Sequence, residues 1–286
     1  MVIKNKKAFS LIELLVVIGI IFILASLLLS SLSVTKEQGR KVVCLNNLKN
    51  LQLAWLLYSN DNEGKVVDNH YSYPITYNWV HGNFGYNVED NTNTFLLVGY
   101  ENSMLGPYTK DYKIYKCPSD RSISTHSGKK YNRVRSYSLN SWIGGENSTN
   151  YHDGIMNNYI KALGKENIPF NFKVYKKIDD FNNPSHIFSF LDELPDSIDD
   201  GQFLVDLTGR ALDYKNAYII YNFVGFSHNK KGALAFVDGH VENKKWQEVW
   251  TIIPGRYGNT GKLIRPIGIS GSKDIEWIME HATSEK

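Results

Sequence analysis

The sequence predicts an α+β protein in which one long N-terminal helix packs on an antiparallel β-sheet. Two patterns at the N-terminus predict the helix: a charge-free apolar stretch from Leu14 to Thr35, and a helical apolar stripe that continues to about residue 59. The rest of the chain consists of short runs of Tyr, Val, Ile and Phe between Asn, Gly, Asp and Pro clusters, which is typical of strands and loops. With 286 residues, 42% of them hydrophobic, the chain is long enough to bury a core.

The charge balance excludes one class of partner. The chain has 32 Lys and Arg against 29 Asp and Glu, and Lys4, Lys6 and Lys7 account for the excess. The remainder is neutral, whereas nucleic-acid binding depends on a basic surface that displaces counterions. We therefore expect no nucleic-acid partner.

The apolar stretch is long enough to cross a membrane. Its twenty-two uncharged residues span roughly 33 Å as a helix, against a hydrocarbon core of about 30 Å. Three lysines precede it, so the positive-inside rule places the N-terminus in the cytoplasm and the rest of the chain outside. A signal peptide cut near Ser31–Ser33 and an uncleaved signal anchor are two interpretations. Glu13 favours a third, because an ionisable group at the edge of a spanning helix indicates a specific partner.

The residues around Glu13 carry a family resemblance. Residues 6–21 read KKAFSLIELLVVIGII and resemble the class III leader of type IV pilins and type II secretion pseudopilins. In that family a prepilin peptidase cuts before the Phe and methylates the new N-terminus, which implies cleavage between Ala8 and Phe9 and N-methylation of Phe9. The family usually has Gly where this chain has Ala8. The resemblance implies a leader peptide (1–8), a transmembrane or filament-core helix (9–35), an amphipathic continuation (36–60) and an exported β-rich head (61–286).

The resemblance also implies how the chain assembles. The Glu13 carboxylate would pair with the Phe9 ammonium of a neighbouring subunit, since either charge alone is costly in apolar surroundings. The alternative is that Glu13 extends to the lipid headgroups. The implied partners are prepilin peptidase and other pilin or pseudopilin subunits, in a type II secretion pseudopilus or a type IV pilus-like filament. The implied location is the bacterial inner membrane, crossed once, with a periplasmic head, or a cell-surface filament.

Periodicity and turn signals predict the elements of the head. An apolar stripe on one face predicts that the helix extends to Ser59, and Asn60–Gly64 supplies the helix stop signal. The members of the stripe are Cys44, Leu48, Leu51, Trp55 and Tyr58. Strands are predicted at 187–191, 218–226, 232–237 and 240–243. The Asp238-Gly239 pair between the last two predicts a hairpin with a type I′ turn, in which both central residues have positive φ.

The resemblance extends into the head through a C-terminal motif. This chain resembles large pseudopilin-like proteins that carry a His-x9-Asp-Gly motif. In this sequence the motif is His228, nine intervening residues and Asp238-Gly239. The resemblance also covers residues 44–54, 58–61, 116–120 and 136–140. His228 and Asp238 lie about 16 Å apart if a strand joins them, which favours structural roles for His228, Asp238 and Gly239. The alternative is a metal or catalytic site that also includes His240.

The two cysteines and the acidic residues are the remaining candidate ligands. Cys44 and Cys117 lie on the exported side, where a disulfide is allowed; two buried free thiols are the alternative. Without a Cys-x-x-Cys pair we expect no zinc. We expect no cofactor and interpret the acidic residues as parts of solvated loops. Calcium binding is the alternative, although none of them matches an EF-hand loop; its candidate ligands are Asp61, Asn62, Glu63, Asp120, Asp192, Glu193, Asp196, Asp199 and Asp200.

No catalytic template is complete. Residues 268–272 differ from the Gly-x-Ser-x-Gly nucleophile elbow at the last position, where Ser272 replaces Gly. The metal-binding pattern His-Glu-x-x-His is absent, so we expect no enzyme. Aromatic residues in a polar loop would stack on sugars or a protein partner if exposed, or pack in strands if buried: Tyr71, Tyr73, Tyr77, Trp79 and Tyr86. The leading hypothesis is a pseudopilin-like subunit, with a secreted cargo as a further candidate partner. The second is a membrane-anchored or released glycan- or surface-binding module, and the third an exported hydrolase that uses His228 or Asp238.

Overall fold

The fold is α+β, as predicted, with a long N-terminal helix and a separate β-rich head. The computed structural model describes residues 10–70, 77–82, 88–99, 101, 103–144, 171–211, 213, 218–248 and 267–286. The chain divides into two compact units, Met1–Arg40 and Lys41–Lys286. The helix α1 (Leu11–Asp61, 51 residues) contributes to both.

The first unit contains the part of α1 that is apolar on every side. From Leu11 to Leu29 all side chains are exposed except Ala25, which is half-buried. A helix that is apolar all round is stable only in apolar surroundings, such as lipid or other helices. By length and composition, α1 is the one described helix that could cross a membrane.

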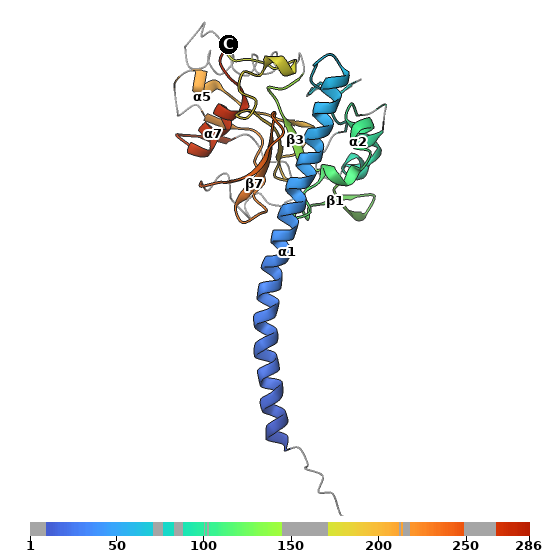
Figure 1. Ribbon diagram of the computed structural model, residues 1–286, viewed down its shortest axis with the longest axis vertical. Coiled ribbons are helices and arrows are strands. Elements are labelled where there is room, and N and C mark those ends of the chain that lie inside the picture. The colour runs from blue at the N-terminus through green and yellow to red at the C-terminus, as the bar shows by residue number, and fades with distance from the viewer. Residues whose placement is uncertain are drawn as a thin grey trace, which may run out of the picture. The chain divides into compact units, whose positions relative to one another are not determined.

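The second unit is built on a five-stranded sheet beside α1 (Figure 1). The strand order is β5 (Gln202–Phe203), β3 (Tyr137–Asn140), β4 (Phe188–Asp192), β7 (Lys231–Phe236) and β8 (Val241–Lys245). The pairings β3–β4, β4–β7 and β7–β8 are antiparallel, as predicted. The pairing of β3 with β5 is parallel, which differs from the predicted meander, because the chain forms β4 before it returns to the far edge of β3.

The remaining described elements surround this sheet. They are η1 (Glu89–Thr92), α2 (Phe95–Val98), α3 (Gly106–Thr109), η2 (Tyr112–Tyr115), the pair β1 (Ile123–His126) and β2 (Lys129–Asn132), η3 (Ile178–Asp180), α5 (Thr208–Ala211), the pair β6 (Tyr218–Ile220) and β9 (Ile267–Ile269), and α7 (Lys273–Ala282).

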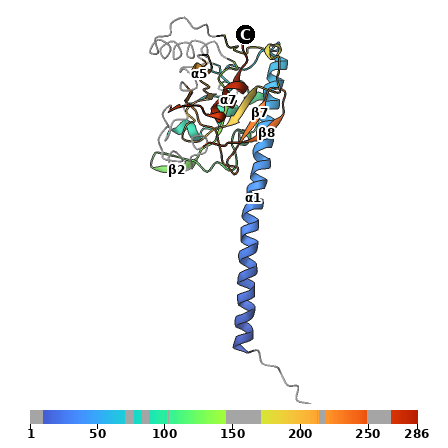
Figure 2. The same ribbon diagram turned by 90° about the vertical axis from the view of Figure 1, so that its left-hand side faces the viewer.

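Two hydrophobic cores cover the two faces of the sheet. In β7 and the residue after it, Ala233, Ala235 and Val237 join the core that contains α1, whereas Leu234 and Phe236 join the core that contains α7. Figures 1 and 2 both show α7 on the opposite side of β7 from α1. The α1 core includes the predicted stripe, with Cys44, Leu48, Leu51 and Trp55 fully buried, so the predicted packing of the helix on the sheet is confirmed.

Two predicted turns form, one of them with a different geometry. α1 ends at Asp61, where Gly64 has positive φ and its N–H donates to the Ser59 carbonyl at 2.9 Å, as expected for a helix stop. The β7–β8 hairpin also forms, but the type I′ prediction is wrong. Gly239 has φ 95°, whereas Asp238 is not among the residues with positive φ. Gly239 N–H donates to the Phe236 carbonyl, so the loop has three residues and needs positive φ only at its glycine.

One predicted strand is shorter than expected. The run from Tyr218 to Phe226 forms β6 only as far as Ile220. The Asn222 side chain then accepts a hydrogen bond from Leu204 N–H at 2.8 Å, and Val224 makes an isolated bridge to Glu193. The second half of the run therefore contacts the segments around Leu204 and Glu193 and forms no strand of its own. Its residues Phe223 and Val224 are nevertheless buried.

Polar side chains fix the position of α1 on the sheet. Lys49 Nζ donates to the Gly239 carbonyl at 2.5 Å, and Gln52 Nε2 donates to the Val237 carbonyl at 3.3 Å. Gln52 Oε1 accepts from the Ser189 hydroxyl in β4 at 2.5 Å. Because Gln52 is fully buried, its amide links the helix to two neighbouring strands inside the core.

We expect Gln52→Ala to lower the free energy of unfolding by about 1–3 kcal/mol, because it removes a buried amide that bonds both Ser189 and Val237. Leu53→Ala, at the next and exposed position of the same helix, is the matched control and should change stability little. Urea unfolding of the full chain in detergent, followed by Trp fluorescence, measures both. Equal midpoints for the two variants would contradict the assigned role of Gln52.

The buried Asp206 predicts a pH-dependent stability. Its Oδ1 accepts from Thr208 N–H at 2.9 Å, and burial raises its pKa from 3.8 to about 6. Since the folded pKa lies above the unfolded one, the folded state is favoured at low pH and loses stability as the pH rises through about 6.

Asp206→Asn keeps an acceptor for Thr208 and removes the charge. We expect it to raise the free energy of unfolding by up to about 3 kcal/mol at neutral pH and by much less near pH 4. Unfolding midpoints of wild type and variant at the two pH values measure the difference. A variant that is no more stable than wild type at neutral pH would show that Asp206 is not destabilised by its burial.

Candidate functional site

The first turn of α1 holds the predicted assembly residue, Glu13. Glu13 N–H donates to Ser10 Oγ at 3.2 Å, and Ser10 N–H donates to Glu13 Oε2 at 2.8 Å, which is a reciprocal capping box. The sequence reasoning did not assign Ser10, although its spacing to Glu13 was the available signal. The predicted cleavage residues Ala8 and Phe9 lie outside the described residues. The capping box holds a carboxylate at the helix end next to the predicted cut.

The structure brings three predicted site residues together in the head. Cys44 of α1, Cys117 after η2 and His228 before β7 converge with Asp192 at the end of β4, and all four are buried. One potential ligand atom from each lies within 4.8 Å of the other three. Sequence reasoning had placed Asp192 only among the candidate calcium ligands. We call these four residues the cysteine cluster.

The predicted Cys44–Cys117 disulfide is not formed in the structure, where both residues are free thiols. Each sulfur has another partner: Tyr137 Oη donates to Cys44 Sγ at 3.2 Å, and Cys117 Sγ lies 3.1 Å from His228 Nε2. The alternative of two buried free thiols is therefore the arrangement observed.

The cysteine cluster is a low-dielectric environment. Desolvation raises the pKa of Asp192 to about 7; the Asp120 charge adds to this shift and His228 opposes it. A hydrogen bond to Cys44, together with burial, raises the pKa of the Cys117 thiol. Burial also holds the pKa of Tyr137 well above its usual value. The surroundings of these side chains thus disfavour uncompensated negative charge.

The other motif residues lie elsewhere. Asp238 Oδ1 accepts from His240 N–H at 3.0 Å in the exposed hairpin turn, and His240 Nδ1 lies 2.6 Å from the same oxygen. His228 therefore belongs to the cysteine cluster, while Asp238 and Gly239 form part of the hairpin turn.

Two of the acidic residues predicted as calcium ligands, Glu193 and Asp120, contact other protein groups. The buried Glu193 accepts from the hydroxyls of Ser138 and Ser197 and from Asn222 Nδ2, and desolvation raises its pKa to about 8. Asp120 Oδ2 lies 3.6 Å from Lys116 Nζ. In the part of the chain that the structure describes, Asp192 is the acidic residue that joins a group of three or more potential metal ligands.

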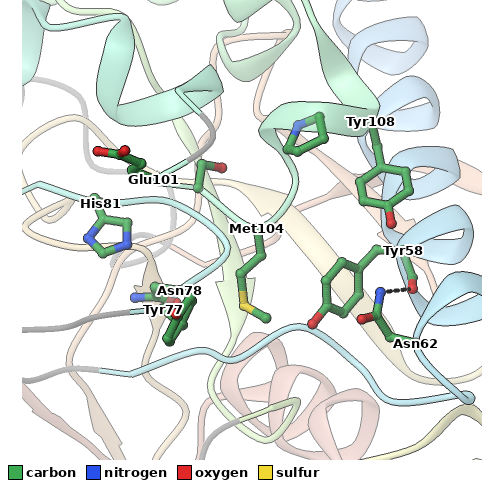
Figure 3. A pocket seen from close by; sticks show the side chains of 10 residues that line it. Tyr58, Asn62, Tyr77, Asn78, His81, Glu101, Met104 and Tyr108 are labelled. Atoms are coloured by element: carbon green, nitrogen blue, oxygen red, sulfur yellow. Dashed lines mark hydrogen bonds between the residues drawn. The ribbon is translucent and has the colours of Figure 1, made fainter.

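A cavity of about 360 Å³ lies at the end of α1 (Figure 3). Its lining is Tyr58, Asn62, Tyr77, Asn78, His81, Glu101, Ser103, Met104, Pro107 and Tyr108. In Figure 3, His81 and Glu101 lie at one end, Tyr58, Asn62 and Tyr108 at the other, and Met104 between them. Burial lowers the pKa of His81 and raises that of Tyr58 to about 12, so both side chains are neutral at pH 7. We call this cavity the tyrosine pocket.

The aromatic residues predicted to bind a ligand divide into two groups. Tyr77 is 68% exposed and lines the tyrosine pocket. Trp79 is fully buried, which is the packing alternative: it stacks on Tyr115, meets Phe190 edge-on and donates Nε1–H to the Gly201 carbonyl. Tyr71, Tyr73 and Tyr86 lie outside the described residues.

Comparison with known proteins identifies the N-terminus. Residues 3–29 match the sequence family described as the Prokaryotic N-terminal methylation motif. No curated protein and no solved structure matches the chain. The matched residues contain Ser10, Glu13 and the exposed apolar part of α1 up to Leu29. This N-terminus is therefore a type IV pilin-like leader, of the kind that prepilin peptidase processes.

Proposed function

We propose that this chain is a pseudopilin-like structural subunit. It is cut between Ala8 and Phe9, methylated on Phe9 and held in the bacterial inner membrane by a single pass of α1, with the head in the periplasm. It assembles through α1 with other subunits into a type II secretion pseudopilus or a type IV pilus-like filament. The observation that carries the proposal is that the methylation-motif match coincides with the all-round apolar surface of α1.

The physical argument concerns what covers this surface. Leaving the large side chains between Leu11 and Leu29 in water would cost roughly 25 cal/mol for each Å² of apolar surface. Lipid covers the surface at no such cost, so apolar contact alone gives a helix little reason to leave the membrane for a filament. A polar pairing that lipid cannot provide would make the helix prefer the filament to the membrane.

Glu13 is the group that provides this pairing. Once Phe9 becomes the N-terminal residue, its ammonium and the Glu13 carboxylate of a neighbour neutralise each other in apolar surroundings. The Ser10 capping box holds the carboxylate in place before the neighbour arrives. The head has a structural and interacting role in this proposal, and no catalytic one; a secreted cargo is the partner that a pseudopilus subunit would meet there.

Three variants separate the charge of Glu13 from its capping role. Glu13→Ala removes both, Glu13→Gln keeps a side chain that can complete the capping box but has no charge, and Ser10→Ala removes the hydroxyl cap and keeps the charge. We expect both Glu13 variants to lose filament incorporation and Ser10→Ala to retain it. Incorporation is measured by shearing cells and sedimenting filaments, with the processed chain in the membrane fraction as the control.

Assembly of Glu13→Gln at the wild-type level would contradict the charge-pairing role and assign Glu13 to helix capping. Loss of assembly in all three variants would mean that helix geometry, and not charge, is the requirement. Limited proteolysis of each variant checks that the head is still folded, because these substitutions lie outside its core.

The tyrosine pocket supports a second candidate function, a membrane-anchored or released module that binds glycans or another surface. Tyr58, Tyr77 and Tyr108 offer aromatic faces, and Asn62 and Asn78 offer amide groups near them. Aromatic faces beside neutral polar groups suit an uncharged, hydroxyl-rich ligand. In this alternative the leader serves export only.

We expect Tyr77→Ala to weaken binding of the full chain to peptidoglycan sacculi by roughly threefold to tenfold if the tyrosine pocket is the glycan site. Tyr131→Ala is the control, since Tyr131 in β2 is a partly exposed tyrosine that stacks on His126 in β1. Co-sedimentation in detergent measures both variants. Equal binding by wild type and Tyr77→Ala would remove the pocket from this role.

A further inference from the structure

The cysteine cluster has the composition of a zinc site. It offers two thiols, one imidazole and one carboxylate, which are the ligand types that zinc binds in a tetrahedral arrangement. Calcium and magnesium prefer oxygen ligands throughout, so two sulfur atoms disfavour both. Among the described residues it is the one group of this kind, and all four members are buried.

The geometry is close to that of a closed tetrahedral site. Zinc bonds of about 2.0–2.3 Å place tetrahedral ligand atoms roughly 3.3–3.8 Å from one another. The four potential ligand atoms lie within 4.8 Å of each other, and Cys117 Sγ and His228 Nε2 are already 3.1 Å apart. Small movements of side chains would therefore complete the coordination.

Neighbouring groups orient the ligands. Ser136 Oγ accepts from Cys117 N–H at 2.8 Å, so this hydroxyl positions one member of the cluster. The Tyr137 hydroxyl donates to Cys44 Sγ, which would stabilise negative charge on that sulfur. Such outer contacts are what fix ligand orientation in metal sites.

The backbone at His228 is also unusual. Asn229 and Lys230, which follow it, both have positive φ, 56° and 62°. Consecutive non-glycine residues in the left-handed region cost free energy, and the surrounding structure must maintain them. This turn leads from the buried His228 directly into β7 at Lys231.

We propose that Cys44, Cys117, Asp192 and His228 bind one zinc ion that joins α1 to the head. The ligands come from four segments far apart in the sequence: the helix α1, the loop after η2, the end of β4 and the turn before β7. Metal binding is therefore coupled to the packing of all four segments. The inference is independent of the proposed function, since it concerns how the head is held on its helix.

A disulfide between Cys44 and Cys117 is the competing arrangement. It would use the two sulfur atoms alone and leave Asp192 and His228 outside the bond. Zinc uses all four side chains and supplies positive charge where burial otherwise disfavours a thiolate or a carboxylate. The two arrangements exclude each other, because a disulfide sulfur is not a thiolate ligand.

The test uses the full chain, purified from membranes in detergent under argon and without chelators, and incubated with one equivalent of zinc. We expect one zinc per chain by elemental analysis, and two reduced thiols by alkylation after denaturation. Replacement with cobalt(II) should give the intense visible absorption of tetrahedral thiolate coordination, which packing of the same residues would not produce.

Matched variants locate the site. Cys117→Ser and Asp192→Asn should each weaken zinc binding by roughly tenfold or more. Asp238→Asn and His240→Ala change the exposed His–Asp pair of the hairpin turn and should leave the stoichiometry unchanged. If a cluster variant fails to fold, the wild-type stoichiometry and the cobalt spectrum still decide the question.

Either of two results would overturn the proposal. A metal-free wild-type chain whose mass is lower by two hydrogen atoms would establish the disulfide. A metal-free chain with two reduced thiols after incubation with zinc would establish that the cluster is packed as neutral side chains.

Discussion

One helix, α1, has to satisfy two different surroundings, and the other features follow from this constraint. Between Leu11 and Leu29 it is apolar on every side, so this part needs lipid or neighbouring helices around it. From Cys44 onward only one face is apolar, and that face is buried in the head. The change from all-round to one-sided apolarity occurs within a single unbroken helix, which explains why the chain cannot shorten it without losing one of the two roles.

The head is organised around the buried face of α1. Leu48, Leu51 and Trp55 supply apolar contact, while Gln52 and Lys49 bond carbonyl groups next to the hairpin turn. Apolar contact is not directional, so the polar links determine where the helix lies along the sheet. The cysteine cluster adds a third kind of contact at the Cys44 end of this face.

The sequence predicted features that depend on local patterns and missed those that depend on distant contacts. The extent of α1 follows from apolar periodicity, and the hairpin at Asp238-Gly239 follows from turn chemistry. The parallel pairing of β3 with β5 could not be predicted, because the strands are not neighbours in the chain. Trp79 lies in a polar stretch, yet it is buried against Tyr115 and Phe190, which come from other parts of the sequence.

The candidate sites show the same division. Glu13 and its leader were recognisable because the motif is continuous, and the match to residues 3–29 covers the same segment. The cysteine cluster was not recognisable, because its four members have no shared spacing. Cysteine spacing predicts a metal site only when ligands are close in sequence. Here the fold brings them together, whereas the sequence patterns grouped Cys44 with Cys117, His228 with Asp238, and Asp192 with other acidic residues.

The mass and N-terminal residue of the chain recovered from native membranes test the central claim most directly. Processing as a pilin-like subunit predicts a mature chain that begins at N-methylated Phe9. A chain that begins near Val34 would indicate ordinary secretion and would leave Glu13 without a role in the mature protein. An intact Met1 would indicate a simple membrane anchor. Either of the last two results would contradict assembly through α1.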